Sequence, residues 1–164
     1  MNIFYRILWK IQRNLDREKL MLQKSRFKYC GSNVGIEPSC IIMVPDRFSI
    51  GDNSSISYGT VVFASYDVTI GKNCLVSSNC GISSYNHTIN SENRRIDDLV
   101  NDQIFSKPVF IGDNVWIGMN SCILPGVAIG NNSIVGSGSV VTKNIPENQI
   151  WAGNPAKFLK ELDL

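Results

Sequence analysis

The sequence contains a single histidine, and its five cysteines include no CxxC pair. Protein zinc sites are built from several Cys, His or acidic ligands, so the sequence predicts no metal centre. An odd number of cysteines also argues against a disulfide framework. We therefore expect a reducing, cytoplasmic environment.

Long apolar runs are absent as well. No stretch approaches the roughly 20 residues that span a bilayer, and the N-terminus lacks the apolar core and small-residue cleavage site of a secretory signal. The net charge of +2 gives no reason to expect nucleic acid as a partner. The charge is unevenly placed, because residues 1–28 carry eight Lys or Arg and two acidic residues, a net +6, which leaves −4 for the remainder.

A period of six residues is the strongest positive signal in the sequence. An aliphatic residue occupies every sixth position in two long series, the first of which contains one two-residue insertion. These positions are Ile50, Ile56, Val62, Ile70, Val76 and Ile82, then Ile111, Ile117, Ile123, Ile129, Val135 and Val141. The next position is often glycine, the two after it are often polar turn formers, and the fifth is small or β-branched.

Neither a helix nor a simple half-buried strand has this period. The pattern indicates a coil of short strands with a bend in every six residues, where Gly and Asn tolerate positive φ. The aliphatic side chain points into the prism and the small fifth residue fits beside it. Each coil needs neighbours to bury its apolar face, as in other repeat proteins.

Particular stretches carry a family resemblance. Residues 111–118 read Ile-Gly-Asp-Asn-Val-Trp-Ile-Gly, residues 123–130 read Ile-Leu-Pro-Gly-Val-Ala-Ile-Gly, and residues 152–157 read Ala-Gly-Asn-Pro-Ala-Lys. From about Val34 to Lys157 the chain resembles the hexapeptide-repeat acyltransferases, in particular the sugar O-acetyltransferase branch with its galactoside, maltose, capsule and O-antigen enzymes. The resemblance implies an all-β, left-handed parallel β-helix, acetyl-CoA as donor, and a homotrimer with active sites between neighbouring prisms.

Three segments are expected along the chain. Residues 1–30 read as an amphipathic helical segment, which either packs on the β-helix base or a neighbouring subunit, or lies on an anionic membrane at the inner face. Residues 31–155 form the β-helix proper, which begins near Val34, has an irregular coil at 40–49 and carries an inserted polar loop at 88–107. A loop of that length is usually functional. Residues 156–164 are predicted to form a short C-terminal helix.

His87 is the candidate general base. It ends a hexapeptide at the mouth of the 88–107 loop, in the context Ser-Tyr-Asn-His, where the resemblance places the family's base. A sugar hydroxyl is a poor nucleophile at neutral pH, and a histidine can take its proton during attack on the thioester. A surface histidine without a role is the alternative. Its orienting partner stays open among Asn86, Glu92, Asp97, Asp98 or a backbone carbonyl.

Other residues are candidates for contacting the acceptor. Asn79 and Tyr85 lie near His87 in sequence, although Asn79 fits a turn equally well. Arg94 and Arg95 could grip an anionic sugar. Trp116 precedes an aliphatic position, so its side chain is expected outside the prism, where the resemblance implies that it lines the active-site groove.

The later coils carry the expected coenzyme A contacts. The resemblance implies that Met119, Ser137 and Gly138 border the pantetheine arm, and that Thr142, Lys143 and Lys157 approach the nucleotide end, where lysines attract phosphate. Gly118 is a candidate backbone donor for the developing oxyanion. Cys74 and Cys80 fit small interior positions rather than a nucleophilic role.

The function predicted is direct acetyl transfer from acetyl-CoA to a sugar hydroxyl, in capsule, lipopolysaccharide or other glycan modification. One alternative is N-acetylation of an amino sugar on a nucleotide carrier, for which the same base and coenzyme A groove would serve. An alternative of another class is a β-helix scaffold without catalysis, which His87 and the motifs at the C-terminal end disfavour.

Overall fold

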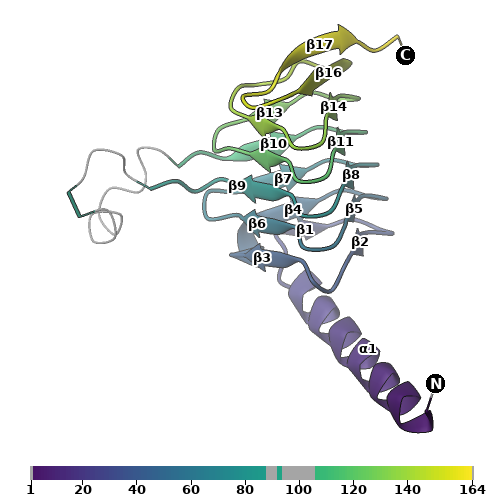
Figure 1. Ribbon diagram of the computed structural model, residues 1–164. Coiled ribbons are helices and arrows are strands. Elements are labelled where there is room, and N and C mark those ends of the chain that lie inside the picture. The colour runs from purple at the N-terminus through teal and green to yellow at the C-terminus, as the bar shows by residue number, and fades with distance from the viewer. Residues whose placement is uncertain (1, 88–91, 94–105, 164) are drawn as a thin grey trace.

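The computed structural model describes residues 2–87, 92–93 and 106–163. One helix, α1 (Ile3–Lys24), precedes a stack of short parallel strands wound into a three-sided prism (Figure 1). Each side of the prism is one sheet, and from β1 to β15 successive strands along the chain fall on successive sheets. The predicted N-terminal helix is confirmed.

The three sheets are here called A, B and C. Sheet A contains β1 (Tyr29–Cys30), β4 (Phe48–Ile50), β7 (Val68–Ile70), β10 (Val109–Ile111) and β13 (Ala128–Ile129). Sheet B contains β2 (Gly35–Ile36), β5 (Ser55–Ile56), β8 (Leu75–Val76), β11 (Trp116–Ile117), β14 (Ile134–Val135), β16 (Gln149–Ala152) and β17 (Lys157–Glu161). Sheet C contains β3 (Ile41–Met43), β6 (Val61–Phe63), β9 (Gly81–Ser83), β12 (Cys122–Ile123) and β15 (Val140–Val141).

The interior is filled by the aliphatic residues of the six-residue period. The register pairs each one with its equivalent in the next coil, for example Ile56 with Val76 and Ile117 with Val135. All twelve residues of the two series are at most 1% exposed. The small fifth-position residues, Cys74 and Cys80 among them, are buried beside the aliphatic stacks. The periodic pattern therefore identified the core correctly.

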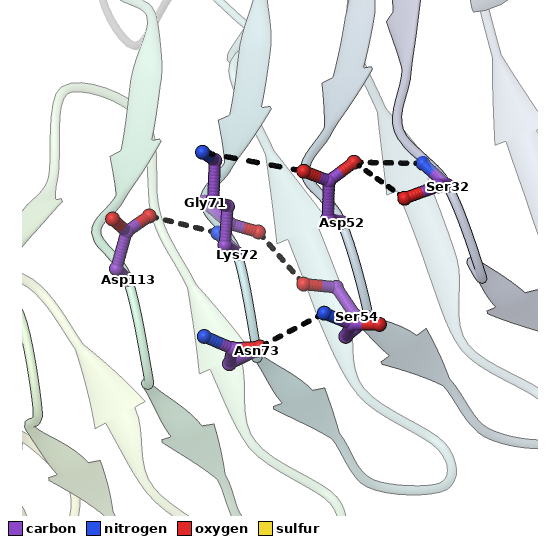
Figure 2. Close-up of polar contacts among 8 residues, drawn as sticks. Ser32, Asp52, Ser54, Gly71, Lys72, Asn73 and Asp113 are labelled. Carbon is purple, nitrogen blue, oxygen red and sulfur yellow. Dashed lines mark hydrogen bonds and ion pairs between the residues drawn. The ribbon is translucent and has the colours of Figure 1, made fainter.

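The corner between sheets A and B shows how the turns are held (Figure 2). A carboxylate of one coil accepts a backbone N–H of a neighbouring coil: Asp52 Oδ1 lies 2.7 Å from Ser32 N, and Asp113 Oδ1 lies 2.8 Å from Lys72 N. The Ser54 hydroxyl donates to the Gly71 carbonyl at 2.7 Å. These bonds satisfy backbone groups that the tight bends leave outside the strand ladders.

Asparagine occupies the left-handed position of the same corner in successive coils. Asn33, Asn53, Asn73, Asn114, Asn132 and Asn148 have φ between +53° and +61°. Asparagine tolerates this conformation better than other residues with a side chain. Their amides also bond along the stack, at 3.0 Å from Asn33 to Asn53 and 2.8 Å from Asn132 to Asn148.

The expected start of the β-helix and its irregular coil need correction. Tyr29 and Cys30 already pair with Ser49 and Ile50, so the first coil begins before Val34 and before residue 31. In residues 40–49 the irregularity is confined to one corner, where Val44 has φ +55° and the 3₁₀ turn η1 (Pro45–Arg47) follows. The strands on both sides keep the register, since β3 pairs with β6 and β4 with β7.

The C-terminal helix predicted for residues 156–164 is wrong. The chain instead turns back after β16, and β17 pairs antiparallel with it. Trp151 and Phe158 meet edge to face, with ring centroids 6.5 Å apart, and Gln149 Nε2 donates to Glu161 Oε1 at 2.8 Å. Phe158 and Leu159, the apolar residues of the segment predicted to be helical, belong instead to an edge strand that pairs with the open edge of β16.

Candidate functional site

A groove on the outer face of sheet C contains the candidate base. Its volume is about 630 Å³, and it is called here the sheet C groove. It is lined by Met43, Val44, Val61, Phe63, Ser65, Gly81, Ile82, Ser83, Tyr85, His87, Cys122, Ile123 and Leu124. Most of this lining is apolar, so a polar reaction there would take place beside a poorly hydrated wall.

His87 lies just beyond the C-terminal end of β9 and is exposed. The Tyr85 hydroxyl lies 3.5 Å from its Nδ1, and the two rings meet edge to face with centroids 5.0 Å apart. Asn86 accepts the backbone N–H of His87 at 3.0 Å. Tyr85, which the sequence analysis assigned to the acceptor, is therefore also in contact with the imidazole.

Ser106 is a residue of this site that the sequence analysis missed. Its side chain is buried, its hydroxyl oxygen accepts the Asn86 backbone N–H at 3.0 Å, and it lies 3.3 Å from the Asn86 carbonyl. A backbone hydrogen bond joins the same two segments, because Lys107 N donates to the Ser84 carbonyl. Both ends of the 88–107 insertion are thereby joined directly beside His87. A lone serine in a polar stretch gives no sequence signal for this role.

Trp116 faces outward, as predicted, but from sheet B rather than sheet C. Its side chain is 48% exposed, and its indole Nε1 donates to Ser77 Oγ at 3.2 Å. Within one chain, Trp116 and His87 therefore belong to different sides of the prism.

Asn79 has the geometry of a turn residue. It has φ +58°, and its backbone N–H donates to the Tyr58 carbonyl at 2.8 Å. Its Oδ1 lies over Gly59, where a Cβ would be only 2.3 Å away. The turn interpretation of Asn79 accounts for these contacts. Of the remaining loop candidates, Glu92 is exposed, whereas Arg94, Arg95, Asp97 and Asp98 lie outside the described residues.

The pantetheine candidates gather at the corner between sheets B and C. Met119 and Gly138 lie in successive coils at this corner, where Gly138 N donates to the Met119 carbonyl at 2.8 Å. Both are exposed, as is Ser137. The Gly118 amide, considered as an oxyanion donor, already donates to the Val135 carbonyl at 2.8 Å. Gly118 instead allows close packing, since a Cβ there would lie 2.5 Å from Ser137 N.

The nucleotide-end candidates come together at the top of the prism. Thr142, Lys143 and Lys157 share a hollow of about 270 Å³ with Trp151, Pro155, Ala156 and Phe158. Both lysines are exposed. The antiparallel turn into β17 brings Lys157 to Lys143, although the sequence had predicted a helix for the segment that contains Lys157.

Two groups of candidates thus lie at opposite edges of sheet C. Tyr85 and His87 follow β9, and Lys143 follows β15, all at the edge where strands of sheet C end. Met119 and Gly138 precede strands of the same sheet, at its other edge.

The five cysteines differ in burial, from the buried Cys40, Cys74 and Cys80 through the half-buried Cys30 to the exposed Cys122. Burial raises the pKa of the Cys74 and Cys80 thiols, so both stay protonated and poorly nucleophilic at neutral pH. Each thiol also lies within bonding distance of a backbone carbonyl, Gly112 and Gly118 respectively. Cys122 is exposed and borders the sheet C groove. In the described ranges, no cluster of three or more His, Cys, Asp or Glu side chains could hold a metal ion.

Comparison with known proteins identifies the family. Residues 108–143 match the family described as bacterial transferase hexapeptide (six repeats), and residues 67–84 match the hexapeptide repeat of succinyl-transferase. Galactoside O-acetyltransferase of Escherichia coli strain K12 is 37% identical over 147 residues, which are 90% of this chain and 69% of that protein. The chain belongs to the hexapeptide-repeat acyltransferases.

Solved structures agree with this assignment. A hexapeptide-repeat acetyltransferase from Vibrio cholerae O1 biovar eltor, complexed with acetyl coenzyme A, superposes with a TM-score of 0.79 at 29% identity, over 91% of this chain and 79% of that one. A galactoside acetyltransferase in complex with coenzyme A gives 0.79 at 34% identity, over 90% and 71%. The predicted left-handed parallel β-helix and the predicted acyltransferase class are confirmed. Within the described ranges, no helix is both long and apolar enough to cross a membrane.

Proposed function

We propose that this chain transfers the acetyl group of acetyl-CoA to a sugar hydroxyl, with His87 as the general base. The observation that carries the proposal is the placement of the sequence's only histidine in the sheet C groove, with the Tyr85 hydroxyl 3.5 Å from Nδ1. The names of the relatives support the substrates, since one is a galactoside O-acetyltransferase and another was solved with acetyl coenzyme A.

The proposed reaction is a direct transfer. The sugar oxygen attacks the thioester carbonyl carbon while its proton passes to Nε2 of His87, and the carbonyl oxygen becomes an oxyanion. As the tetrahedral intermediate collapses, the carbon–sulfur bond breaks and the imidazolium returns the proton to the coenzyme A thiolate. The Tyr85 contact at Nδ1 holds the ring orientation. General-base catalysis of this kind is typically worth roughly a hundred- to ten-thousand-fold in rate.

The donor is proposed to lie along sheet C. The hollow at Lys143 and Lys157 offers two ammonium groups to the phosphates of coenzyme A, with Thr142 beside them. Met119, Ser137 and Gly138 border the pantetheine arm, and Gly138 leaves open space there, because a Cβ at this residue would meet nothing within 4 Å. Trp116 lines the same path from sheet B.

A homotrimer is proposed to complete the active site. Trp116 lies on sheet B while His87 and its groove lie on sheet C, so one prism presents the two residues on different sides. Packing sheet B of one subunit against sheet C of the next would bring them together. The apolar lining of the sheet C groove, with Phe63 and Leu124, suits such a partly covered surface.

The acceptor is proposed to be a sugar of a capsule, lipopolysaccharide or other glycan, modified on the cytoplasmic side. Arg94 and Arg95 are proposed to contact an anionic group of that sugar. The 88–107 insertion that carries them leaves the prism directly beside His87, where the Asn86–Ser106 hydrogen bonds join its two ends.

The test measures free coenzyme A released from acetyl-CoA by the purified protein with free sugars, nucleotide sugars and capsular oligosaccharides. We expect release with one class of acceptor and an O-acetyl ester as the product. His87→Ala should lower kcat about 10²- to 10⁴-fold and leave acetyl-CoA binding intact. Lys143→Ala and Lys157→Ala should mainly raise KM for acetyl-CoA, whereas Lys160→Ala on the same strand as Lys157 should not.

The outcomes separate the alternatives. Wild-type turnover by His87→Ala would remove the proposed base. An N-acetyl product from a nucleotide-linked amino sugar would replace the hydroxyl acceptor by an amine. A protein that binds no acetyl-CoA would leave only the scaffold interpretation.

A further inference from the structure

Helix α1 is mostly uncovered. It has no buried residue, and it extends away from the base of the prism (Figure 1). Large apolar side chains along its whole length are exposed, among them Ile11 at 50% and Leu22 at 68%. Scattered exposed apolar residues are normal on a protein surface, but apolar residues gathered on one face mark a binding surface.

These side chains form a row on one face. Residues three or four apart lie on the same side of a helix, and this spacing joins Phe4, Leu8, Ile11 and Leu15. Leu22, seven residues after Leu15, lies on the same face two turns farther on. These five residues are here called the α1 stripe. Ile7 extends it sideways. Lysine and arginine dominate the opposite side of the helix, at Arg6, Lys10, Arg13, Arg17 and Lys24. Such separation is typical of helices that lie in the interface of a bilayer.

The α1 stripe points away from the prism. The contacts that fix α1 to the β-helix come from its other side: Leu20 packs against the core, and Gln23 Nε2 donates to the Ile42 carbonyl at 3.3 Å. Farther up the helix, Trp9 and Arg13 share a hollow with Pro38 of the first coil. A flat surface could therefore meet the stripe while the prism stays on the far side of the helix.

Charge favours a lipid surface over other copies of the helix. Helix α1 carries six Lys or Arg and two acidic residues, and residues 1–28 are +6 in a chain whose remainder is −4. Bundling identical helices of this charge would place like charges together, whereas an anionic surface attracts α1 and repels the prism. A helix is about 10–12 Å wide, so basic side chains on the far side still reach within about one Debye length of the surface.

We propose that α1 docks on an anionic lipid bilayer through the α1 stripe and holds the β-helix above it. The stripe enters the boundary between headgroups and acyl chains, and the basic side chains that do not contact the prism stay with the headgroups. The helix end at Gln23 and Lys24 is tied to the first coil, so docking also sets the direction of the prism relative to the surface. This placement does not depend on which acceptor the enzyme modifies.

Vesicle flotation with the full-length protein tests the proposal. The probes are vesicles of phosphatidylcholine alone and of phosphatidylcholine with about one third phosphatidylglycerol. We expect binding only to the anionic vesicles, and binding that weakens as salt rises. Ile11→Glu on the stripe should lower the vesicle partition coefficient at least tenfold. The neighbouring Gln12→Glu adds the same charge off the stripe and should lower it less than threefold.

Light scattering reports the oligomeric state of each variant, and coenzyme A release reports its turnover, so a loss of vesicle binding can be told apart from a loss of assembly or activity. Both variants should keep the oligomeric state and the turnover of a water-soluble acceptor. Equal weakening by Ile11→Glu and Gln12→Glu would reject the stripe as the docking face. Failure of the wild type to bind either vesicle would reject docking altogether. If Ile11→Glu instead changed the oligomeric state, the stripe would be an interface between copies of the chain.

Discussion

The prism and helix α1 use the same kind of residue at equally regular spacing, with opposite results. Ile117, in the six-residue period, is fully buried, whereas Ile11, in the α1 stripe, is half exposed. The cause is the location of the covering partner. Each prism coil is covered by the next coil of the same chain, but no described residue covers the α1 stripe. Regular spacing thus indicates which face of an element is apolar. Only the structure shows whether another part of the same chain covers that face.

The same truncation at these two isoleucines should show the difference most strongly. Ile117→Ala removes buried methyl groups and leaves a cavity in the central stack, so we expect a loss of about 2–5 kcal/mol in the free energy of unfolding. Ile11→Ala on the exposed stripe should change it by less than about 0.5 kcal/mol. Urea denaturation followed by circular dichroism measures both. Similar losses would mean that the stripe is covered in solution.

Two asparagines, Asn73 in the prism and Asn14 in α1, differ in backbone conformation and test the same contrast. Asn73 has φ +57° and accepts the Asn53 amide at 3.3 Å, so Asn73→Ala should cost about 1–2 kcal/mol from the left-handed backbone alone. Asn14→Ala, on exposed α1, should instead stabilise the helix by up to about 0.7 kcal/mol. Thermal denaturation should therefore shift in opposite directions. A neutral Asn73→Ala would show that this corner tolerates any residue.

The smallest effect is expected from a surface carboxylate of the corner in Figure 2. Hydrogen bonds from the Ser32 backbone N–H and hydroxyl, and then Lys72 nearby, lower the pKa of Asp52. A lowered folded-state pKa gives stability that is present above the unfolded pKa and lost as pH falls through the folded value. Asp52→Asn should therefore destabilise slightly at pH 7 and converge with wild type in acid.

Urea denaturation at pH 7 and in acid measures how Asp52→Asn changes the free energy of unfolding. Asp16→Asn on α1 serves as the control, because Asp16 accepts a side-chain bond from Gln12 within the helix rather than a bond between coils. A gap between Asp52→Asn and wild type that persisted in acid would show that the charge of Asp52 is not the cause.

Sequence periodicity predicted the interior of the fold almost completely. An interior aliphatic residue has only one direction to point, so Ile50 and its equivalents could be assigned from their spacing alone. The ends of the stack were harder. Cys30 occupies a strand position without being aliphatic, and the apolar residues Phe158 and Leu159 fit a helix as well as an edge strand. Their conformation depends on the free edge of β16, which lies outside the local pattern.

The candidate site was also predicted only in part, because some of its contacts depend on the fold and not on the local sequence pattern. His87 could be named as a candidate because it is the only histidine, and Lys143 because it follows a regular coil. The contact of Tyr85 with the imidazole and the burial of Ser106 depend on how the chain leaves and re-enters the prism. The Gly118 amide was expected to be available, but the ladder bond to Val135 uses it.

Each end of the prism carries a segment that breaks the repeat. At one end β17 runs antiparallel along β16; at the other, the side chains of Gln23 and Lys24 donate to the Ile42 and Val34 carbonyls. A stack of identical coils has no inherent length, and an uncovered terminal coil would be a template on which another copy could continue the stack. By covering part of each terminal coil, these two segments oppose end-to-end growth of the stack.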